Sequence, residues 1–124
     1  MTFFRKEKFN QESIKMLQDA GINFDSLRQE GIEPLVLADY LTSSGLVLNE
    51  DARWITFHGA FDYAYLIKIL TNQKLPETYD SYKTMTGQYF PTTYDTKIIA
   101  NEVDDIKGTS LQKLGNEFGV NLNF

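Results

Sequence analysis

The chain has 124 residues and a formal net charge of −5, with 42% hydrophobic and 23% charged residues. These values are typical of one small globular domain rather than of a disordered segment. Cysteine is absent from the sequence, which excludes disulfides, zinc thiolate sites and a cysteine nucleophile. The acidic balance disfavours a protein that coats nucleic acid by neutralising its phosphates.

Apolar runs fall well short of the roughly 20 residues that a membrane-spanning helix needs. The first residues, Met-Thr-Phe-Phe-Arg-Lys-Glu-Lys, contain no apolar core of signal-peptide length. We therefore expect an intracellular protein with no membrane partner.

Three helices are predicted in the first third of the chain from their apolar spacing and their end signals. Glycine after the last helical turn is a normal stop, and proline suits a first turn. The third of these helices is expected to turn Leu35, Ala38, Tyr40 and Leu41 inward. The predicted helices are residues 10–20 before Gly21, residues 25–30 before Gly31, and a helix from Pro34 that ends at Gly45.

Residues 54–70 are the stretch around which the chain is organised. Their first part is apolar, aromatic and β-branched, which predicts a buried strand. The pattern breaks at His58-Gly59, and a helical spacing then begins at Phe61. A strand, a turn of small residues and a helix place polar groups at the carboxyl edge of an α/β sheet, where ligands usually bind. The apolar positions of the expected helix are Tyr63, Leu66, Ile67 and Leu70.

The remaining elements complete an α/β pattern. Residues 78–89 are predicted to be helical, with Tyr79, Tyr82, Met85 and Tyr89 at near-helical spacing and Pro91 as the stop. Residues 94–100 are predicted to be a second strand, and a last helix is expected from Ser110 through Phe118. We expect helices around a short parallel strand pair. Because two strands make a poor independent sheet, the pair is expected to belong to a larger one.

Three residues of the predicted strand edge are candidates for a site, and each has a structural alternative. Asp62 is either an acid favoured by the positive end of its helix or a metal-binding, catalytic carboxylate. His58 is either a turn histidine bonded to backbone or a contact to substrate. Asp95 either holds a loop or a helix end, or supports a metal ligand. A glycine-rich phosphate loop of the Walker type is absent from the sequence.

The central stretch resembles the second exonuclease motif of the Caf/Pop-type poly(A) deadenylases, the DEDD-class 3′–5′ exoribonuclease subunits of the Ccr-Not complex. The motif is Trp-Ile-Thr-Phe-His-Gly-Ala-Phe-Asp-Tyr-Ala-Tyr-Leu-Ile-Lys-Ile-Leu-Thr-Asn at residues 54–72. Its flanks match in order, so the resemblance runs from about residue 9 to 118. The flanking matches are residues 9–22, 30–33, 42–48 and 75–76, and Phe90-Pro91 with Tyr94-Asp95-x-Lys97.

The resemblance implies a ribonuclease H-like fold and an enzyme that removes poly(A) tails in mRNA turnover. Four acidic positions of that family bind two divalent cations, Mg²⁺ or Mn²⁺, and Asp62 matches one of them. The implied partners are poly(A) RNA rather than DNA, a Not-type scaffold and Ccr-type nuclease subunits. The implied location is the cytoplasm, with the nucleus as a second one. The acidic net charge agrees with such an enzyme, in which acids hold cations that face the phosphate.

Two motifs of that family have no counterpart in this sequence. One is an Asp-x-Glu pair before the region matching Phe9, and the other is a His-x-Ala-Gly-x-Asp motif after the region matching Phe118. We therefore expect residues 1–124 to be a single incomplete exonuclease domain without its outer strands, with impaired activity. The alternative is a non-catalytic remnant that binds a Not-type scaffold. The apolar segment 41–48 resembles the family's scaffold-facing surface, although core packing explains it equally well.

Overall fold

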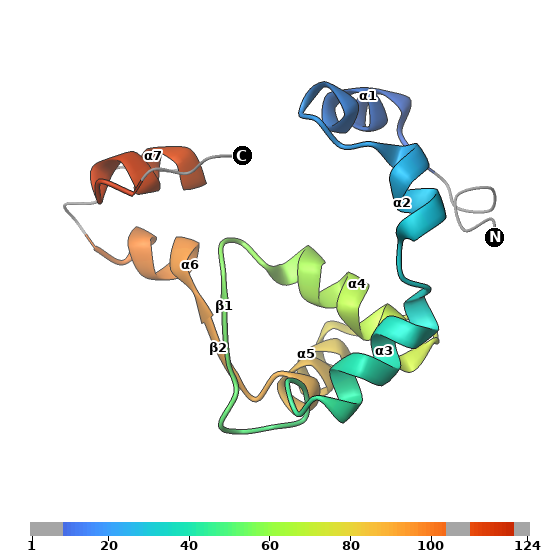
Figure 1. The fold of residues 1–124 in the computed structure, drawn as a ribbon. Coiled ribbons are helices and arrows are strands. Elements are labelled where there is room, and N and C mark those ends of the chain that lie inside the picture. The colour runs from blue at the N-terminus through green and yellow to red at the C-terminus, as the bar shows by residue number, and fades with distance from the viewer. Residues whose placement is uncertain (1–8, 104–109, 121–124) are drawn as a thin grey trace. The chain divides into compact units, whose positions relative to one another are not determined.

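The computed structural model of the chain describes residues 9–103 and 110–120 (Figure 1). The chain divides into two compact units, one before Pro34 and one from Pro34 onward. None of the described helices is long and apolar enough to cross a membrane.

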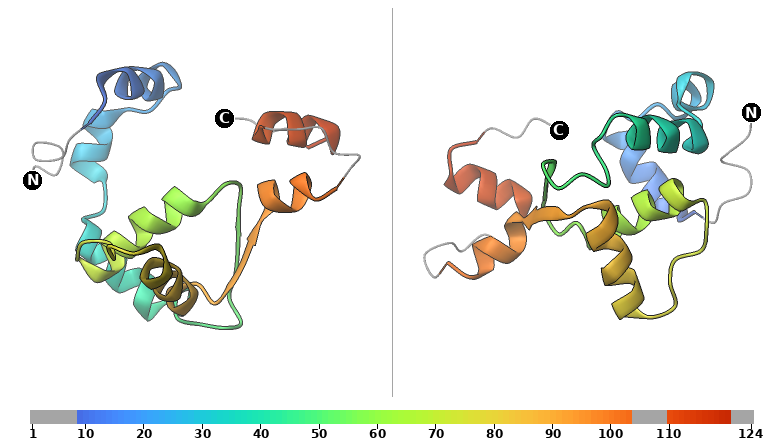
Figure 2. Two further views of the ribbon diagram at one scale, coloured as in Figure 1. Left: turned by 180° about the vertical axis from the view of Figure 1, so that it is seen from behind. Right: turned by 90° about the horizontal axis from the view of Figure 1, so that it is seen from below.

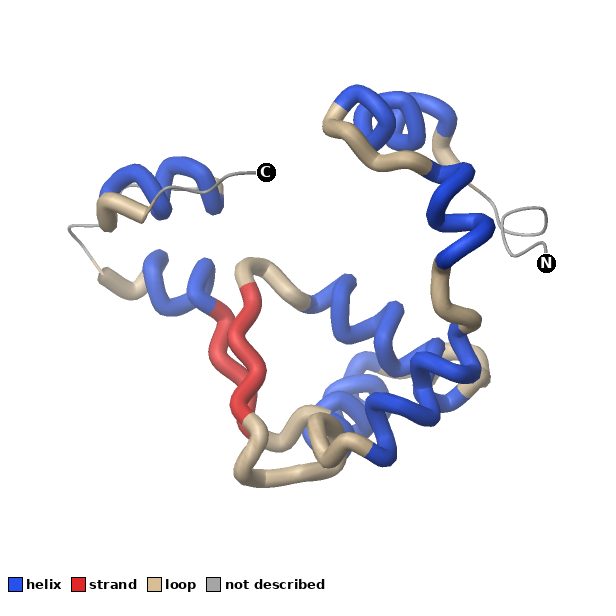
Figure 3. The backbone as a smooth tube through the Cα atoms, in the orientation of Figure 1, coloured by secondary structure: helices blue, strands red, loops and turns tan. Residues whose placement is uncertain are grey.

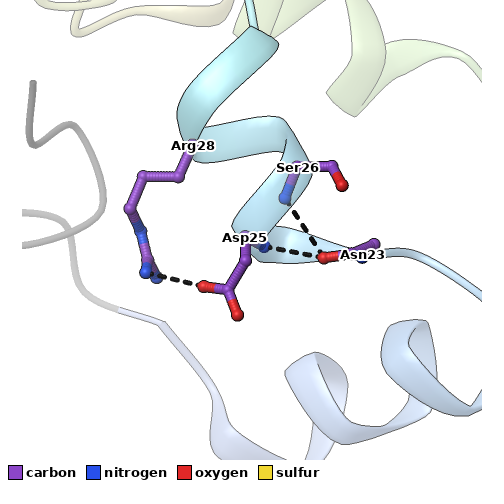
Figure 4. Close-up of polar contacts among 4 residues, drawn as sticks. All are labelled: Asn23, Asp25, Ser26 and Arg28. Carbon is purple, nitrogen blue, oxygen red and sulfur yellow. Dashed lines mark hydrogen bonds and ion pairs between the residues drawn. The ribbon is translucent and has the colours of Figure 1, made fainter.

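The first unit contains α1 (Gln11–Asp19) and α2 (Phe24–Glu30), and both helices begin at an asparagine cap. Asn23 accepts hydrogen bonds from the backbone N–H groups of Asp25 and Ser26 at 3.0 and 3.1 Å, as Figure 4 shows. An exposed ion pair joins Arg28 to Asp25 at 2.9 Å and adds little stability. Neither helix buries a side chain fully, so these caps supply much of what stabilises two such short helices.

The second unit places a cluster of three helices beside a pair of strands. The cluster consists of α3 (Pro34–Ser43), α4 (Ala60–Thr71) and α5 (Tyr79–Tyr89), with α4 packed against both of the others (Figure 2). The strands β1 (Arg53–Thr56) and β2 (Thr92–Asp95) run side by side (Figure 3). A short helix, α6 (Thr96–Asn101), follows β2 directly and contacts both strands. The last described helix is α7 (Leu111–Glu117), with Ser110 as its cap.

The strands are parallel, as the sequence predicted, and their register pairs Thr56 with Asp95. The expectation of a fully buried strand is wrong for β1 within the described residues. Trp54 and Thr56 are half-buried, whereas Ile55 is 70% exposed and its partner Tyr94 is also exposed. One face of the pair therefore packs on the core, and the face that bears Ile55 and Tyr94 is not covered by the part of the chain that the structure describes.

The core of the second unit lies between α4, α5 and the segments that flank them. Phe90 and Ile67 are each only 1% exposed. The ring of Phe90 meets Tyr63 at a centroid distance of 4.8 Å and Trp54 at 4.9 Å, edge to face in the second case. The predicted inward face of α4 is confirmed, because Tyr63 and Ile67 are buried and Leu66 and Leu70 pack against them.

Two sequence predictions about these elements are wrong. The second strand predicted at residues 94–100 is present but misplaced, because β2 covers Thr92–Asp95 and residues 96–100 belong to α6. In α3, Ala38 is buried and Leu41 is half-buried, but Leu35 and Tyr40 face solvent. Among the described elements α3 packs mainly against α4, and the side chains that it covers there include Ala38 and Leu41.

Candidate functional site at the carboxyl end of the strand pair

The carboxyl ends of both strands meet at one edge, since β1 and β2 are parallel and in register at their last residues. A helix begins close to each end, α4 at Ala60 and α6 at Thr96. The first turns of helices carry unpaired N–H groups and the positive end of the helix dipole, which favour acidic side chains and anions. We call residues 56–62 and 95–97 the corner, because they join the strands to these helices.

Asp95 holds the corner together. Its Oδ1 accepts hydrogen bonds from the backbone N–H of His58 at 2.8 Å and of Lys97 at 3.0 Å. Its Oδ2 accepts from the backbone N–H of Gly59 at 2.9 Å. One carboxylate therefore caps α6 and also binds two successive amides of the turn after β1. A second hydrogen bond joins the start of α6 to the end of β1, where the hydroxyl of Thr96 donates to the carbonyl of Thr56 at 2.8 Å.

These hydrogen bonds also determine the charge state of Asp95. Burial alone raises the pKa of the carboxyl group, but the N–H groups of His58, Gly59 and Lys97, helped by that of Ile98, lower it by more in total. The pKa of Asp95 therefore lies below its ordinary value. The group is ionised at neutral pH and accepts charge-assisted hydrogen bonds, which are stronger than neutral ones.

His58 lies in the turn with a backbone φ of +60°, a left-handed conformation that is unusual for a residue with a side chain. Its imidazole is exposed, and the Nδ1 atom is 3.2 Å from the Nζ atom of Lys97. The same ammonium lies 5.8 Å from the centre of the Phe57 ring. Within residues 9–103 and 110–120, the hydrogen-bonding contact of the His58 ring is with this side chain and not with the backbone.

Asp62 lies in the first turn of α4 and is exposed. Among the described residues its carboxylate has no hydrogen-bond or ion-pair partner. The helix cap of α4 is Gly59, which has no side chain to satisfy the first N–H groups. The carboxylate of Asp62 is therefore free to bind a ligand, and its place near the helix start explains its presence equally well.

A buried layer of small and hydroxyl groups underlies the corner. The hydroxyls of Thr56 and Tyr63 are both buried, and neither forms a hydrogen bond of good geometry within the described residues. Burial raises the pKa of Tyr63 above its ordinary value, and Asp95 and Asp62 raise it further, although the nearby Thr56 hydroxyl opposes this. A Cβ added to Gly59 would lie 2.5 Å from the Thr56 side chain. The turn consequently has room for glycine alone at position 59.

The described residues do not complete a site for a divalent cation. In residues 9–103 and 110–120, no three histidine or acidic side chains lie close enough to hold a metal. The carboxylate of Asp95 is already engaged by backbone N–H groups, which leaves Asp62. A single carboxylate supplies one ligand of the near-octahedral set around Mg²⁺, which gives up its waters reluctantly, so Asp62 alone does not bind the ion tightly.

Of the predicted site residues Asp62, His58 and Asp95, the last two are in direct contact, through the backbone N–H of His58 and the carboxylate of Asp95. The part played by Lys97, which contacts the His58 ring, was not predicted. The spacing Asp95-x-Lys97 at the end of a strand was a usable signal, since a capping acid places the residue two positions later in the first turn of a helix.

The apolar segment 41–48 and the tyrosines of α5 each contain both buried and exposed side chains. In the segment 41–48, Val47 belongs to the core, whereas Leu46 and Leu48 are 50% and 55% exposed. Of the tyrosines on α5, Tyr82 and Tyr89 pack against the core, whereas Tyr79 faces solvent.

Comparison with known proteins identifies relatives along most of the chain. Residues 37–122 match the sequence profile of the family described as CAF1 family ribonuclease. The chain is 42% identical over 103 residues to the probable CCR4-associated factor 1 homolog 7 of Arabidopsis thaliana, which covers 83% of this chain and 37% of that protein. It is 45% identical over 92 residues to the poly(A) ribonuclease pop2 of Schizosaccharomyces pombe, and this match covers 74% of this chain and 28% of that protein.

Solved structures agree with this relationship. The structure of S. pombe Pop2p in its Mg²⁺- and Mn²⁺-bound form matches with a TM-score of 0.88 and 36% identity, over 98% of this chain and 48% of that one. The yeast CAF1 co-crystallised with the NOT1 MIF4G domain matches with a TM-score of 0.78 and 32% identity, over 94% of this chain and 44% of that one. The chain thus spans less than half the length of each of these relatives. Sequence and fold together show that it belongs to the CAF1 family of ribonucleases.

Proposed function

We propose that this chain contributes to a metal-dependent, poly(A)-specific 3′–5′ exoribonuclease, in which Asp62 is the carboxylate on which activity depends. The observation that carries the proposal is the free, exposed carboxylate of Asp62 at the strand edge of a CAF1-family fold. Its relative pop2 is a poly(A) ribonuclease, and the matching Pop2p structure contains Mg²⁺ and Mn²⁺.

In this proposal Asp95 positions the start of α4 and, with it, Asp62. Asp95 binds the amides of His58 and Gly59, so it determines where α4 begins. Asp62 follows within the first turn of that helix and is therefore held at a defined place on the strand edge. The further carboxylates that a pair of divalent cations needs would have to come from residues other than those described here.

The direct test is the shortening of a 3′-adenylated RNA in the presence of Mg²⁺. We expect Asp62→Ala to lower the rate by about 100-fold or more, because even residues that only support metal ligands cost 10–100-fold. Asp80→Ala is the matched control, since Asp80 is also an exposed acid in the first turn of a helix. Equal rates for wild type and Asp62→Ala would remove Asp62 from the mechanism.

A Not-type scaffold is the protein partner that we propose. The CAF1 match was solved together with the NOT1 MIF4G domain, and the exposed Leu46 and Leu48 give this chain an apolar surface next to its core. Leu46→Asp with Leu48→Asp is expected to weaken binding to a NOT1-type MIF4G domain in a calorimetric titration. Unchanged affinity would exclude this surface. Binding by a folded wild-type chain that leaves adenylated RNA intact would instead favour the non-catalytic remnant.

A further inference from the structure

His58 and Lys97 form a polar pair that the sequence did not indicate. They come from different segments, the turn after β1 and the first turn of α6. Both backbones are bound by the same atom, because Oδ1 of Asp95 accepts from the N–H of His58 and from the N–H of Lys97. The two side chains are therefore brought together by an anchored backbone, and their nitrogen atoms lie 3.2 Å apart.

The chemistry of this contact determines where the proton of His58 lies. A lysine ammonium has three donors and no acceptor, so it bonds only to a nitrogen that carries a lone pair. The nitrogen in contact is Nδ1, and neutral His58 must therefore carry its proton on Nε2. The nearby ring of Phe57 adds a cation–π attraction that keeps the ammonium in place.

We propose that Lys97 is a positioning residue that holds His58 in its Nε2–H form, so that this N–H donates to a phosphate oxygen of the RNA. The role in RNA binding rests on the proposed function, whereas the tautomer does not. Nε2 has no hydrogen-bond partner among the described residues, and the imidazole is exposed at the strand edge that also bears Asp62.

The tautomer is tested by ¹⁵N nuclear magnetic resonance of the imidazole, which needs no assignment because the chain has a single histidine. At about pH 8.5 an ordinary imidazole is neutral and a lysine is charged. We expect the wild type to show one protonated nitrogen, Nε2, and one unprotonated nitrogen, Nδ1. Lys97→Met should give averaged signals from two tautomers, and Lys97→Arg should restore the single form. Averaged signals in the wild type, or no change in Lys97→Met, would overturn the assignment.

The ligand role is tested by the affinity for a short oligoadenylate in the Asp62→Ala background, where the proposed function predicts that the probe stays intact. We expect Lys97→Met to weaken binding by about fivefold to tenfold, the equivalent of one hydrogen bond. Lys97→Arg should bind like the parent. Lys83→Met, which removes an exposed lysine of α5, is the charge-matched control and should have a smaller effect.

A double-mutant cycle separates positioning from simple charge. If Lys97 acts only through His58, then Lys97→Met should cost little affinity in a protein that already carries His58→Ala. Additive losses would show that Lys97 attracts the phosphate independently and would overturn the positioning role. A single tautomer in a protein that binds no oligoadenylate would overturn the ligand role along with the proposed function, while leaving the tautomer established.

Discussion

Asp95→Asn tests the structure most directly, because one side chain joins the turn after β1 to the start of α6. An asparagine has one acceptor oxygen in place of two. If that oxygen keeps the bonds to His58 and Lys97, the amide nitrogen then faces the N–H of Gly59, donor against donor. Gly59 is buried, so its N–H loses a partner that water does not readily replace.

The expected loss of stability follows from these contacts. An unsatisfied buried donor costs about 1–3 kcal/mol, and the two surviving bonds become weaker because they are no longer charge-assisted. We therefore expect Asp95→Asn to lower the free energy of unfolding by about 2–3 kcal/mol.

Urea unfolding followed by tryptophan fluorescence measures this effect in the unit that contains the corner. Trp54 is the only tryptophan of the chain, it lies on β1, and its indole N–H donates to the carbonyl of Leu46 at 3.0 Å. Asp80→Asn removes the same charge from an exposed first-turn position and should change stability by less than about 0.5 kcal/mol. Equal midpoints for the two variants would refute the reasoning about Asp95.

Two further predictions concern the same corner. Because the folded state lowers the pKa of Asp95, the stabilisation that this carboxylate provides is present above about pH 4 and is lost as the pH falls through the folded pKa. The free energy of unfolding should therefore fall less steeply with decreasing pH in Asp95→Asn than in wild type. Parallel curves of unfolding free energy against pH would contradict this. Gly59→Ala should destabilise the protein by about 1–3 kcal/mol in urea unfolding, because the new methyl group overlaps the Thr56 side chain. Gly87→Ala is its control, since a methyl group there meets no atom within 4 Å and alanine favours a helix by about 0.5–1 kcal/mol; similar losses at both positions would exclude the steric explanation.

The helices of the chain were predictable because their signals are local. The spacing of Tyr63 and Ile67 predicted the buried side of α4, and asparagine, serine or threonine marks the start of several helices. The prediction failed at residues 96–100, where Thr96, Ile98 and Ile99 are β-branched and favour a strand. Asp95 decided the outcome there, because its carboxylate accepts from the N–H of Lys97 and begins a helix.

The candidate site was only partly readable from the sequence for a related reason. The position of Asp62 after a strand and a turn follows from local pattern. The bonds from His58 and Gly59 to Asp95 join residues that are 37 and 36 positions apart. No periodicity predicts which amides meet a distant carboxylate, so the contact between Lys97 and His58 required the register of the parallel strands.

The uncovered face of the strand pair affects how the protein behaves in solution. Ile55 and Tyr94 are adjacent across the two strands, and neither is covered by another described segment. In the described residues the sheet has only these two strands, so the outer edge of each presents free backbone groups that favour intermolecular pairing. Within the described residues, this face and these strand edges are therefore where another strand or a second molecule would pack.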